Sequence, residues 1–163
     1  LLRRLIGAGI ELELVHGSGI HPVKVDEGQM EQVLINLAVN ARDAMSGNGK
    51  LVIETQNFTT RQPLKLLSEE MPHGHWILIT VTDTGCGIAK KTLTRIFEPF
   101  FTTKAVGEGT GLGLATVYGI IRQTGGYLDV ESEVDQGTSF KIYLPRATET
   151  DKEEQTDTSR TEE

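Results

Sequence analysis

The sequence predicts a single α/β or α+β domain, and three observations support this class. The chain has 163 residues, of which 37% are hydrophobic and 24% charged, enough for one buried core and too few for two. Strand-like alternation and helix-like periodicity both occur along it. Short glycine-rich segments separate these stretches. The single cysteine, Cys86, excludes an internal disulfide and favours a reducing, cytoplasmic setting.

The first predicted elements are a strand and a long helix. Residues 10–15 alternate apolar and acidic side chains before the turn at 17–19, which is typical of a half-buried edge or second strand. A helix is expected after Asp26, because Asp26 and Gln29 form a capping-box-like start. Its apolar residues recur at helical spacing and predict one core-facing stripe, formed by Met30, Val33, Leu34, Leu37, Ala38, Ala41 and Met45.

Two further strands are predicted at 50–58 and 75–82. The second is almost continuously apolar and should therefore be central in a sheet. Residues 59–74 contain two prolines and are predicted as a variable loop. The remaining expected elements are helices at 89–96 and 112–123 and a β-hairpin formed by 127–133 and 138–144.

The formal net charge of −7 is concentrated near the C-terminus. Residues 146–163 hold seven acids and three bases, a net charge of −4. We therefore predict a folded domain at 1–145 and an acidic, disordered linker or tail at 146–163. No basic stripe favours binding to a nucleic-acid polymer, and no 18-residue apolar span predicts direct membrane insertion. Because the chain starts mid-pattern without an initiator Met, we expect it to be a fragment of a longer protein.

Two asparagines and an aspartate border the apolar stripe of the long helix. At about 100° per residue, Asn36, Asn40 and Asp43 fall on one face beside that stripe. Asparagine is a poor residue for a helix interior. The pattern is compatible with simple solvent exposure, or with paired amides that line a polar ligand or hard-cation site.

An acid and two glycines follow the central apolar strand, in Asp83-Thr84-Gly85-Cys86-Gly87. A carboxylate at the end of a buried strand can accept a hydrogen bond from an exocyclic amine, and glycines let the backbone approach a flat ring. An ordinary turn is the alternative interpretation. Cys86 is expected to pack as a small apolar residue between the glycines.

A glycine-rich segment at 102–114 precedes the second long helix. Backbone N–H groups at a helix N-terminus bind phosphate, and Gly109, Gly111 and Gly113 permit close approach. The spacing is neither that of a P-loop nor that of a Rossmann turn. With Lys104 near its start, the segment is interpreted as a mobile lid or, alternatively, as a flexible linker.

Four stretches together resemble, in order, the motifs of sensor histidine kinases. Residues 36–44 resemble the N box, 83–88 the first glycine box, 96–101 the F box and 109–114 the second glycine box. The resemblance covers residues 8 to 145. It implies a Bergerat (GHKL) ATP-binding fold, an α+β two-layer sandwich with a mixed five-stranded sheet, about three helices on one face and a glycine-rich ATP lid.

The resemblance also implies how the adenine of ATP is bound. Asp83 would accept from the adenine amine, and Gly85, Gly87 and Ile88 would shape the pocket. Thr138 matches the threonine that joins adenine recognition, often through water.

At the phosphate end, the resemblance implies that Asn40 coordinates Mg²⁺ and that Asn36 assists one turn earlier. Asp43 occupies a position where many such kinases carry a phosphate-binding lysine. The expected phosphate contacts come from Lys104, Gly109, Thr110, Gly111, Leu112 and Gly113.

The implied function is that of the Mg-ATP-binding catalytic domain of a two-component histidine kinase. It would present the γ-phosphate to a phosphoacceptor histidine on a dimerisation domain absent from this chain. Asn36 stands where ATP-hydrolysing relatives typically carry a glutamate, and an amide is no general base at neutral pH. Because no His-Asp/Glu phosphoacceptor motif occurs, the chain is expected to bind ATP without autophosphorylating.

Residues 40–44, 102–110 and 115–120 look most like PAS-containing hybrid kinases of the CckA type. This subfamily implies a dimerising histidine domain before Leu1 and a response-regulator receiver domain as a partner. A cytoplasmic location is expected for the fragment, whether or not the full-length protein is anchored in a membrane.

Two other functions compete with this interpretation. One is a regulatory module that binds a second ligand, such as a cyclic dinucleotide, with a base stacked among Tyr118, Arg122 and Tyr127. The alternative for these three residues is an exposed helix face and a hairpin aromatic. The other competing function is a true ATPase of the GHKL fold.

Overall fold

The computed structural model describes residues 2–67, 69–99, 101 and 113–147. Its main feature is a mixed five-stranded sheet with the order β1-β2-β5-β7-β6. The five strands are β1 (Ile10–His16), β2 (Gly49–Thr60), β5 (Gly74–Asp83), β6 (Tyr127–Glu133) and β7 (Gly137–Pro145). β1 runs parallel to β2, and the other neighbours are antiparallel. The strand at 10–15 was predicted to be an edge or second strand, and β1 is at the edge of the sheet. The prediction that β5 is central is confirmed.

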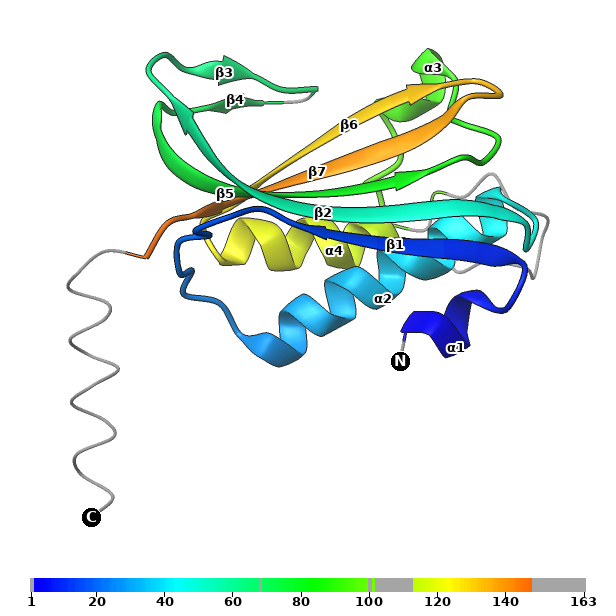
Figure 1. Cartoon of the computed structure of the whole chain (residues 1–163). Helices are drawn as coiled ribbons and strands as arrows, with labels where there is room; N and C mark the ends of the chain where they lie inside the picture. Colours follow the sequence, from blue (N-terminus) through cyan, green and yellow to red (C-terminus); the bar gives the residue numbers. More distant parts are fainter. Residues whose placement is uncertain (1, 68, 100, 102–112, 148–163) are drawn as a thin grey trace.

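Helices cover one face of this sheet. Figure 1 shows α1 (Leu2–Ile6), α2 (Glu27–Ala44) and α4 (Gly113–Gln123) beneath the sheet, which gives two layers. A short helix, α3 (Lys90–Leu93), lies near the β6–β7 hairpin and occupies part of the helix predicted at 89–96. The predicted α+β sandwich, with about three helices on one face, is therefore confirmed.

The start and the buried face of α2 follow from its sequence. The Oδ1 atom of Asp26 accepts a hydrogen bond from the Gln29 N–H at 2.9 Å, which caps the helix. The predicted apolar stripe faces the core, and Leu34 is its one partly buried member. At the other end, Ser46 and Gly47 adopt positive φ angles of 53° and 81°, which end the helix.

The main core lies between the sheet and α2 and α4. Residues at alternate positions along each strand enter it, as the two-residue period of a strand requires. The fully buried contributors include Ile10, Leu51, Val117, Ile121, Leu128, Phe140, Ile142 and Leu144.

The other face of the sheet is partly covered by a feature that the sequence analysis missed. Within the predicted loop 59–74, β3 (Leu64–Lys65) and β4 (Glu70–Met71) pair antiparallel. We call residues 61–73 the β3–β4 flap, which stands above the sheet in Figure 1. Its buried side chains, Leu66 and Met71, form a second apolar cluster with Trp76, Leu78 and Tyr143. The loop prediction was wrong there because two prolines masked two strands of only two residues each.

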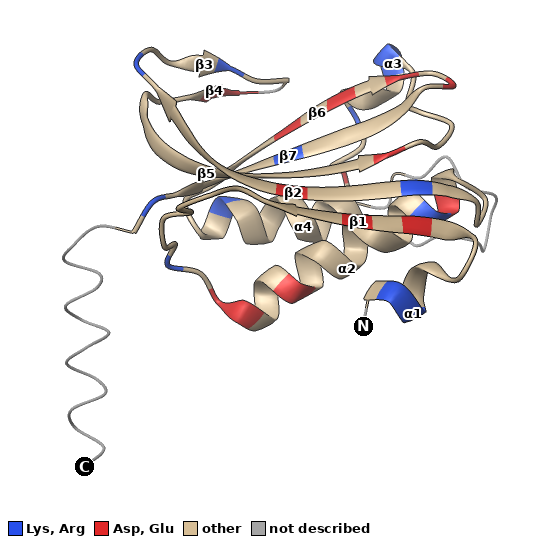
Figure 2. Cartoon of the chain, viewed as in Figure 1, with Lys and Arg blue, Asp and Glu red and all other residues tan. Residues whose placement is uncertain are grey.

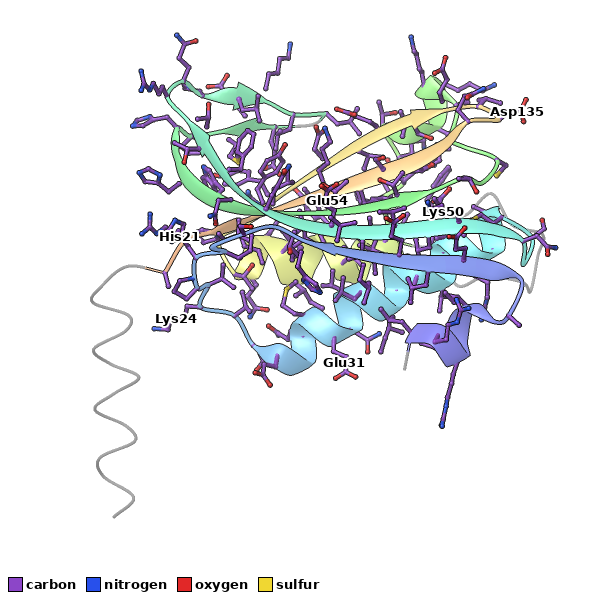
Figure 3. The ribbon with its side chains drawn as sticks, viewed as in Figure 1. His21, Lys24, Glu31, Lys50, Glu54 and Asp135 are labelled. Carbon is purple, nitrogen blue, oxygen red and sulfur yellow. The ribbon has the colours of Figure 1, made fainter. Side chains whose placement is uncertain are left out.

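Charged side chains are distributed over many elements. Figure 2 shows basic residues on α1 and α3 and acidic residues on β1 and β6. On the face of the sheet away from the helices, Lys50 of β2 forms an ion pair of 2.8 Å with Glu13 of β1 (Figure 3). The acidic segment predicted as a tail lies outside the described residues from position 148 onward. None of the helices in the described ranges is long and apolar enough to cross a membrane.

The two-layer core predicts the effect of truncating a central side chain. Ile142 on β7 is fully buried between the layers, whereas Leu14 on β1 is 53% exposed. We expect Ile142→Ala to lower the free energy of unfolding by about 2–5 kcal/mol, because it leaves a cavity in the core. Urea unfolding measures this change. Leu14→Ala is the control and should change it far less, and equal losses in both variants would contradict this description of the core.

Candidate functional site

The centre of the candidate site is a pair of polar residues at the end of two adjacent strands. Asp83 is the last residue of β5, and it pairs directly with Thr138 near the start of β7. Both are buried, with 4% and 5% of their surface exposed. The alternation along the strands places them on the same face as Val81 and Phe140, which belong to the main core. The sheet thus carries a carboxylate and a hydroxyl at one end of its helix-covered face.

Among the described residues, protein donors satisfy the Asp83 carboxylate only in part. Its Oδ1 atom accepts a hydrogen bond of 2.8 Å from the Gly85 N–H. Burial raises the pKa of Asp83 above its ordinary value of 3.8, and the backbone N–H groups of Gly85 and Thr138 partly oppose that rise. An ionised carboxylate can accept about four hydrogen bonds. Asp83 therefore has capacity left for a donor from a ligand.

The turn after Asp83 is clamped between the end of α2 and the β6–β7 hairpin. The Cys86 N–H donates to Ala44 O at 3.0 Å, and Cys86 O accepts from the Asp135 N–H at 2.8 Å. Asp135 lies at the tip of the hairpin (Figure 3). The Cys86 side chain is exposed, so the expectation that it packs between the glycines was wrong. The backbone of residue 86, and not its side chain, holds the turn in place.

Both glycines of this turn are required by close approaches. A Cβ at Gly85 would lie 2.7 Å from Ala44 O. Gly87 has a φ of 72°, and a Cβ there would collide with Glu133 O. The turn therefore needs glycine at both positions, whether or not a ligand is bound.

Ser132 on β6 connects three parts of the site, and sequence reasoning did not identify it. Its Oγ atom accepts from the Ile88 N–H at 2.7 Å, lies 2.8 Å from Thr138 Oγ1 and donates to Gly137 O at 3.0 Å. The sequence does contain a signal: 128, 130 and 132 share one face of the strand, and 132 is the polar member of that set. A polar residue at a core-facing position needs partners.

The two asparagines on α2 have different surroundings. The Nδ2 atom of Asn36 donates to Gly113 O at 3.2 Å, and its Oδ1 atom accepts from Gln32 Nε2 at 2.7 Å. Asn36 thus connects α2 to the start of α4. Asn40 is half-buried, and its side chain has no hydrogen bond within the part of the chain that the structure describes. One turn further on, Ala44 contacts the Asp83 turn, so the Asn40 end of α2 borders the site.

The remaining predicted phosphate contacts are only partly described. Asp43 lies 3.3 Å from Arg42 Nη2, consistent with a carboxylate that is paired with a neighbouring cation. Gly113 is the first residue of α4. The other predicted residues, Lys104, Gly109, Thr110, Gly111 and Leu112, lie outside the described residues. No group of three or more His, Cys, Asp or Glu side chains in the described ranges could hold a metal ion.

The three residues predicted for a second ligand already contact protein groups. Tyr118 stacks on Phe97, with ring centroids 5.5 Å apart and planes at 25°. The Arg122 guanidinium lies 4.7 Å from the centroid of Tyr127 and 3.1 Å from Glu69 of the β3–β4 flap. Arg122 and Tyr127 are therefore brought together, but they stack on each other and not around a gap.

A polar hollow of ≈ 290 Å³ lies beside the turn of the β6–β7 hairpin. Its lining residues are Thr82, Asp83, Glu131, Ser132, Glu133, Gln136, Gly137, Thr138 and Ser139. Asp83 and Thr138 are both among these lining residues, so the hollow borders the pair.

Comparison with known proteins identifies the family. Residues 25–148 match the family described as histidine kinase-, DNA gyrase B-, and HSP90-like ATPase. The chain is 54% identical to the sensor kinase CckA of Brucella abortus over 149 residues, which covers 91% of this chain and 16% of that protein. It is 36% identical to the sensor histidine kinase ZraS of Escherichia coli K12, over 83% of this chain and 26% of that protein.

Solved structures show the same fold. Full-length ShkA in complex with AMPPNP superposes with a TM-score of 0.67 at 31% identity, over 86% of this chain and 26% of that chain. The nucleotide-free catalytic domain of histidine kinase ThkA superposes with a TM-score of 0.66 at 29% identity, over 89% of this chain and 82% of that chain. This chain therefore spans about a sixth of the length of CckA and about four-fifths of the isolated ThkA catalytic domain. From the family match and these likenesses, the chain belongs to the histidine kinase-, DNA gyrase B- and HSP90-like ATPases, as an ATP-binding catalytic domain of the histidine-kinase type.

Proposed function

We propose that this domain binds Mg-ATP with its adenine at the Asp83–Thr138 pair and presents the γ-phosphate to a histidine on another domain. The observation that carries the proposal is the buried Asp83 carboxylate, which retains acceptor capacity at the end of β5. A buried carboxylate is costly unless a partner is supplied. An exocyclic amine supplies two N–H donors of the required kind.

At the adenine end, the protein provides a rigid frame for a flat ring. Asp83 accepts from the amine, and Thr138 lies beside it on the neighbouring strand. Gly85 and Gly87 add no side chains to the turn, and Ile88 is partly buried against the main core. These features favour a planar base with a donor at its edge.

At the phosphate end, Asn40 is the residue that fits a Mg²⁺ ion. Its amide oxygen is a hard ligand, and its side chain has no other hydrogen bond among the described residues. Mg²⁺ is typically held by one or two protein ligands together with waters and substrate phosphates. This preference agrees with a site that has no carboxylate cluster in the described ranges. The bound ion would neutralise phosphate charge.

Other phosphate contacts are proposed from the second glycine box and from the lysine that precedes it. They are Lys104, Gly109, Thr110, Gly111, Leu112 and Gly113. Asn36 acts indirectly, because its amide holds the carbonyl of Gly113 at the start of α4. The N–H groups at this helix start are suited to anions.

The reaction that follows from this arrangement is phosphoryl transfer to a histidine. The γ-phosphoryl group leaves ATP, a bond forms to an imidazole nitrogen, and ADP is released. Positioning and charge neutralisation carry such a reaction, with little acid–base chemistry required of the protein. The acceptor histidine and the receiver domain of a response regulator would be partners beyond this chain.

A second candidate function is regulation by a cyclic dinucleotide at Tyr118, Arg122 and Tyr127. The favouring observation is that Arg122 and Tyr127 form a cation–π pair at a half-exposed guanidinium. A base would have to displace Tyr118 from Phe97 or Arg122 from Tyr127 in order to stack there. Titration with a cyclic dinucleotide, followed by the same titration of Tyr118→Ala, tests this function. Absence of binding, or binding that Tyr118→Ala leaves unchanged, removes it.

Replacing the Asp83 carboxylate by an amide tests recognition of the base. Asp83→Asn should weaken ATP binding at least tenfold, because it replaces a charged acceptor whose hydrogen bond is worth about 1.5–3 kcal/mol. Calorimetry with a non-hydrolysable ATP analogue measures the affinity. Asp135→Asn, the same change at the exposed hairpin tip, is the matched control and should bind like the wild type. Unchanged affinity of Asp83→Asn would refute the assignment.

The second prediction concerns stability and pH. Burial raises the pKa of Asp83 in the folded state above 3.8, so its ionised form destabilises the fold at neutral pH. Asp83→Asn should therefore have a Tm at pH 7 equal to or above that of the wild type. The difference should vanish as pH falls through the raised folded-state pKa towards the ordinary value, because the wild-type carboxyl becomes neutral. Thermal unfolding of both proteins across this pH range is the measurement, and a gap that widens on acidification would contradict the sign of the shift.

The third prediction concerns the metal. Asn40→Ala should abolish most of the gain in affinity for the ATP analogue that Mg²⁺ gives, while binding measured in EDTA changes little. Calorimetry with Mg²⁺ and with EDTA separates the metal-dependent part of the affinity from the metal-independent part. Gln56→Ala, an exposed amide on β2, is the control. An equal Mg²⁺ effect in Asn40→Ala and the wild type would exclude Asn40 as the ligand.

A further inference from the structure

We propose that Ser132 is a positioning residue that holds the Thr138 hydroxyl as a hydrogen-bond acceptor, and that this orientation helps the site to select an amine-bearing purine. The inference rests on the proposed function, because it concerns the same base-binding end of the site. Nothing in the sequence motifs points to Ser132.

The Ser132 hydroxyl has three neighbours with which it can form hydrogen bonds. A serine hydroxyl has one hydrogen to donate and two lone pairs to accept with. One lone pair accepts from the Ile88 N–H at 2.7 Å. Gly137 O, 3.0 Å away, can only accept a hydrogen bond, whereas Thr138 Oγ1 can donate one, so we assign the Ser132 hydrogen to Gly137 O. The remaining lone pair is the one available to Thr138 Oγ1, 2.8 Å away. All three capacities of Ser132 are then used.

The second step is the consequence for Thr138. Because Ser132 has spent its hydrogen on Gly137, the hydrogen of the 2.8 Å contact comes from Thr138. The Thr138 oxygen then offers lone pairs and no hydrogen to a ligand. Thr138 is 5% exposed, so water competes little for its hydroxyl.

The edge of a bound base would face both Asp83 and Thr138. Asp83 and Thr138 occupy directly paired positions on β5 and β7, so a ligand edge meets two acceptors side by side. An exocyclic amine, which has two hydrogens, satisfies both directly or through a water. An exocyclic carbonyl in the same place would face two acceptors and find no donor, which is the kind of mismatch that gives strong discrimination.

Ser132 also has a structural role that the experiment must separate from this one. Its bond to the Ile88 N–H ties the segment after the Asp83 turn to β6. Loss of that tie would loosen the pocket for every nucleotide equally. Loss of the Thr138 orientation would instead change the preference between bases.

The test compares ATP with inosine 5′-triphosphate, which carries a carbonyl in place of the amine. Both are titrated as competitors of a fluorescent ATP analogue, in the presence of Mg²⁺. In Ser132→Ala, the freed Thr138 hydroxyl can rotate and donate to the carbonyl. We expect the preference for ATP over inosine 5′-triphosphate, measured as the ratio of their affinities, to fall by about fivefold to tenfold. That change corresponds to one ordinary hydrogen bond.

Four further variants make the result specific. Ser139→Ala removes the neighbouring hydroxyl, which lies on the opposite face of β7 against Thr82, and should leave the ratio unchanged. Ser132→Thr keeps the hydroxyl and should keep the wild-type ratio. In a Thr138→Val background, Ser132→Ala should no longer change the ratio, because the group through which it acts is gone. If Ser132→Ala does not fold, Ser132→Cys retains the volume with a weak donor and should narrow the ratio in the same direction.

The outcomes separate this inference from the proposed function. Wild-type protein that binds neither nucleotide would overturn the proposed function itself. Wild-type protein that binds ATP, together with a Ser132→Ala variant that weakens both nucleotides by the same factor, would overturn the positioning role and leave only the structural one.

Discussion

The pairing of Asp83 with Thr138 across β5 and β7 is the constraint on which the rest of the site depends. Strand side chains alternate between faces, so a slip of one residue in this register would turn one of the two away from the helices. The register is held by the main core, since Val81 and Phe140 form the next pair on the same face and are both buried. Close backbone contacts maintain it at the strand ends: a Cβ at Gly137 would collide with Asp83 O. The geometry that presents the carboxylate is thus a by-product of packing the sheet against α2 and α4.

The same pairing places a cost on the fold. A carboxylate at 4% exposure loses hydration, and burial is the main reason for its raised pKa. Only one oxygen has a short bond in the described structure, to the Gly85 N–H. The tightly packed apolar core, in which Ile142 and Val117 are fully buried, offsets the free energy lost when the carboxylate gives up its hydration. The unspent acceptor capacity of Asp83 is then the source of its affinity for a donor, because a ligand that supplies the missing bond also relieves the buried charge.

Much of the fold could be predicted from the sequence, because its long elements have strong periodic patterns. The α2 stripe and its Asp26 cap, the edge position of β1 and the central position of β5 all follow from apolar spacing. The β3–β4 flap could not be predicted, since two-residue strands carry no period and depend on burial against Trp76 and Tyr143. Ser132 was missed for a related reason, because its contacts depend on the fold. Ile88 is far from it in the sequence, and Thr138 comes next to it only when β6 and β7 pair. Arg122 shows the converse, because its spacing from Tyr118 suggested an open stacking site, whereas the fold brings in Glu69 and Tyr127 as partners.

The arrangement of polar groups separates holding a nucleotide from breaking it. In the proposed function, Asn36 takes the position of a general base that would activate water, and its amide is engaged with Gln32 and with the carbonyl of Gly113. An amide so placed neither accepts a proton at neutral pH nor frees a water molecule for attack. The acidic groups near the base, Asp83 above all, are at the opposite end of the proposed ligand from the γ-phosphate. Under the proposed function, such a domain would depend on a nucleophile from another domain for turnover. The slow ATP hydrolysis that we expect of this domain therefore follows from the identity of Asn36 and from its hydrogen bonds. It requires no change in the fold that the domain shares with ATPases.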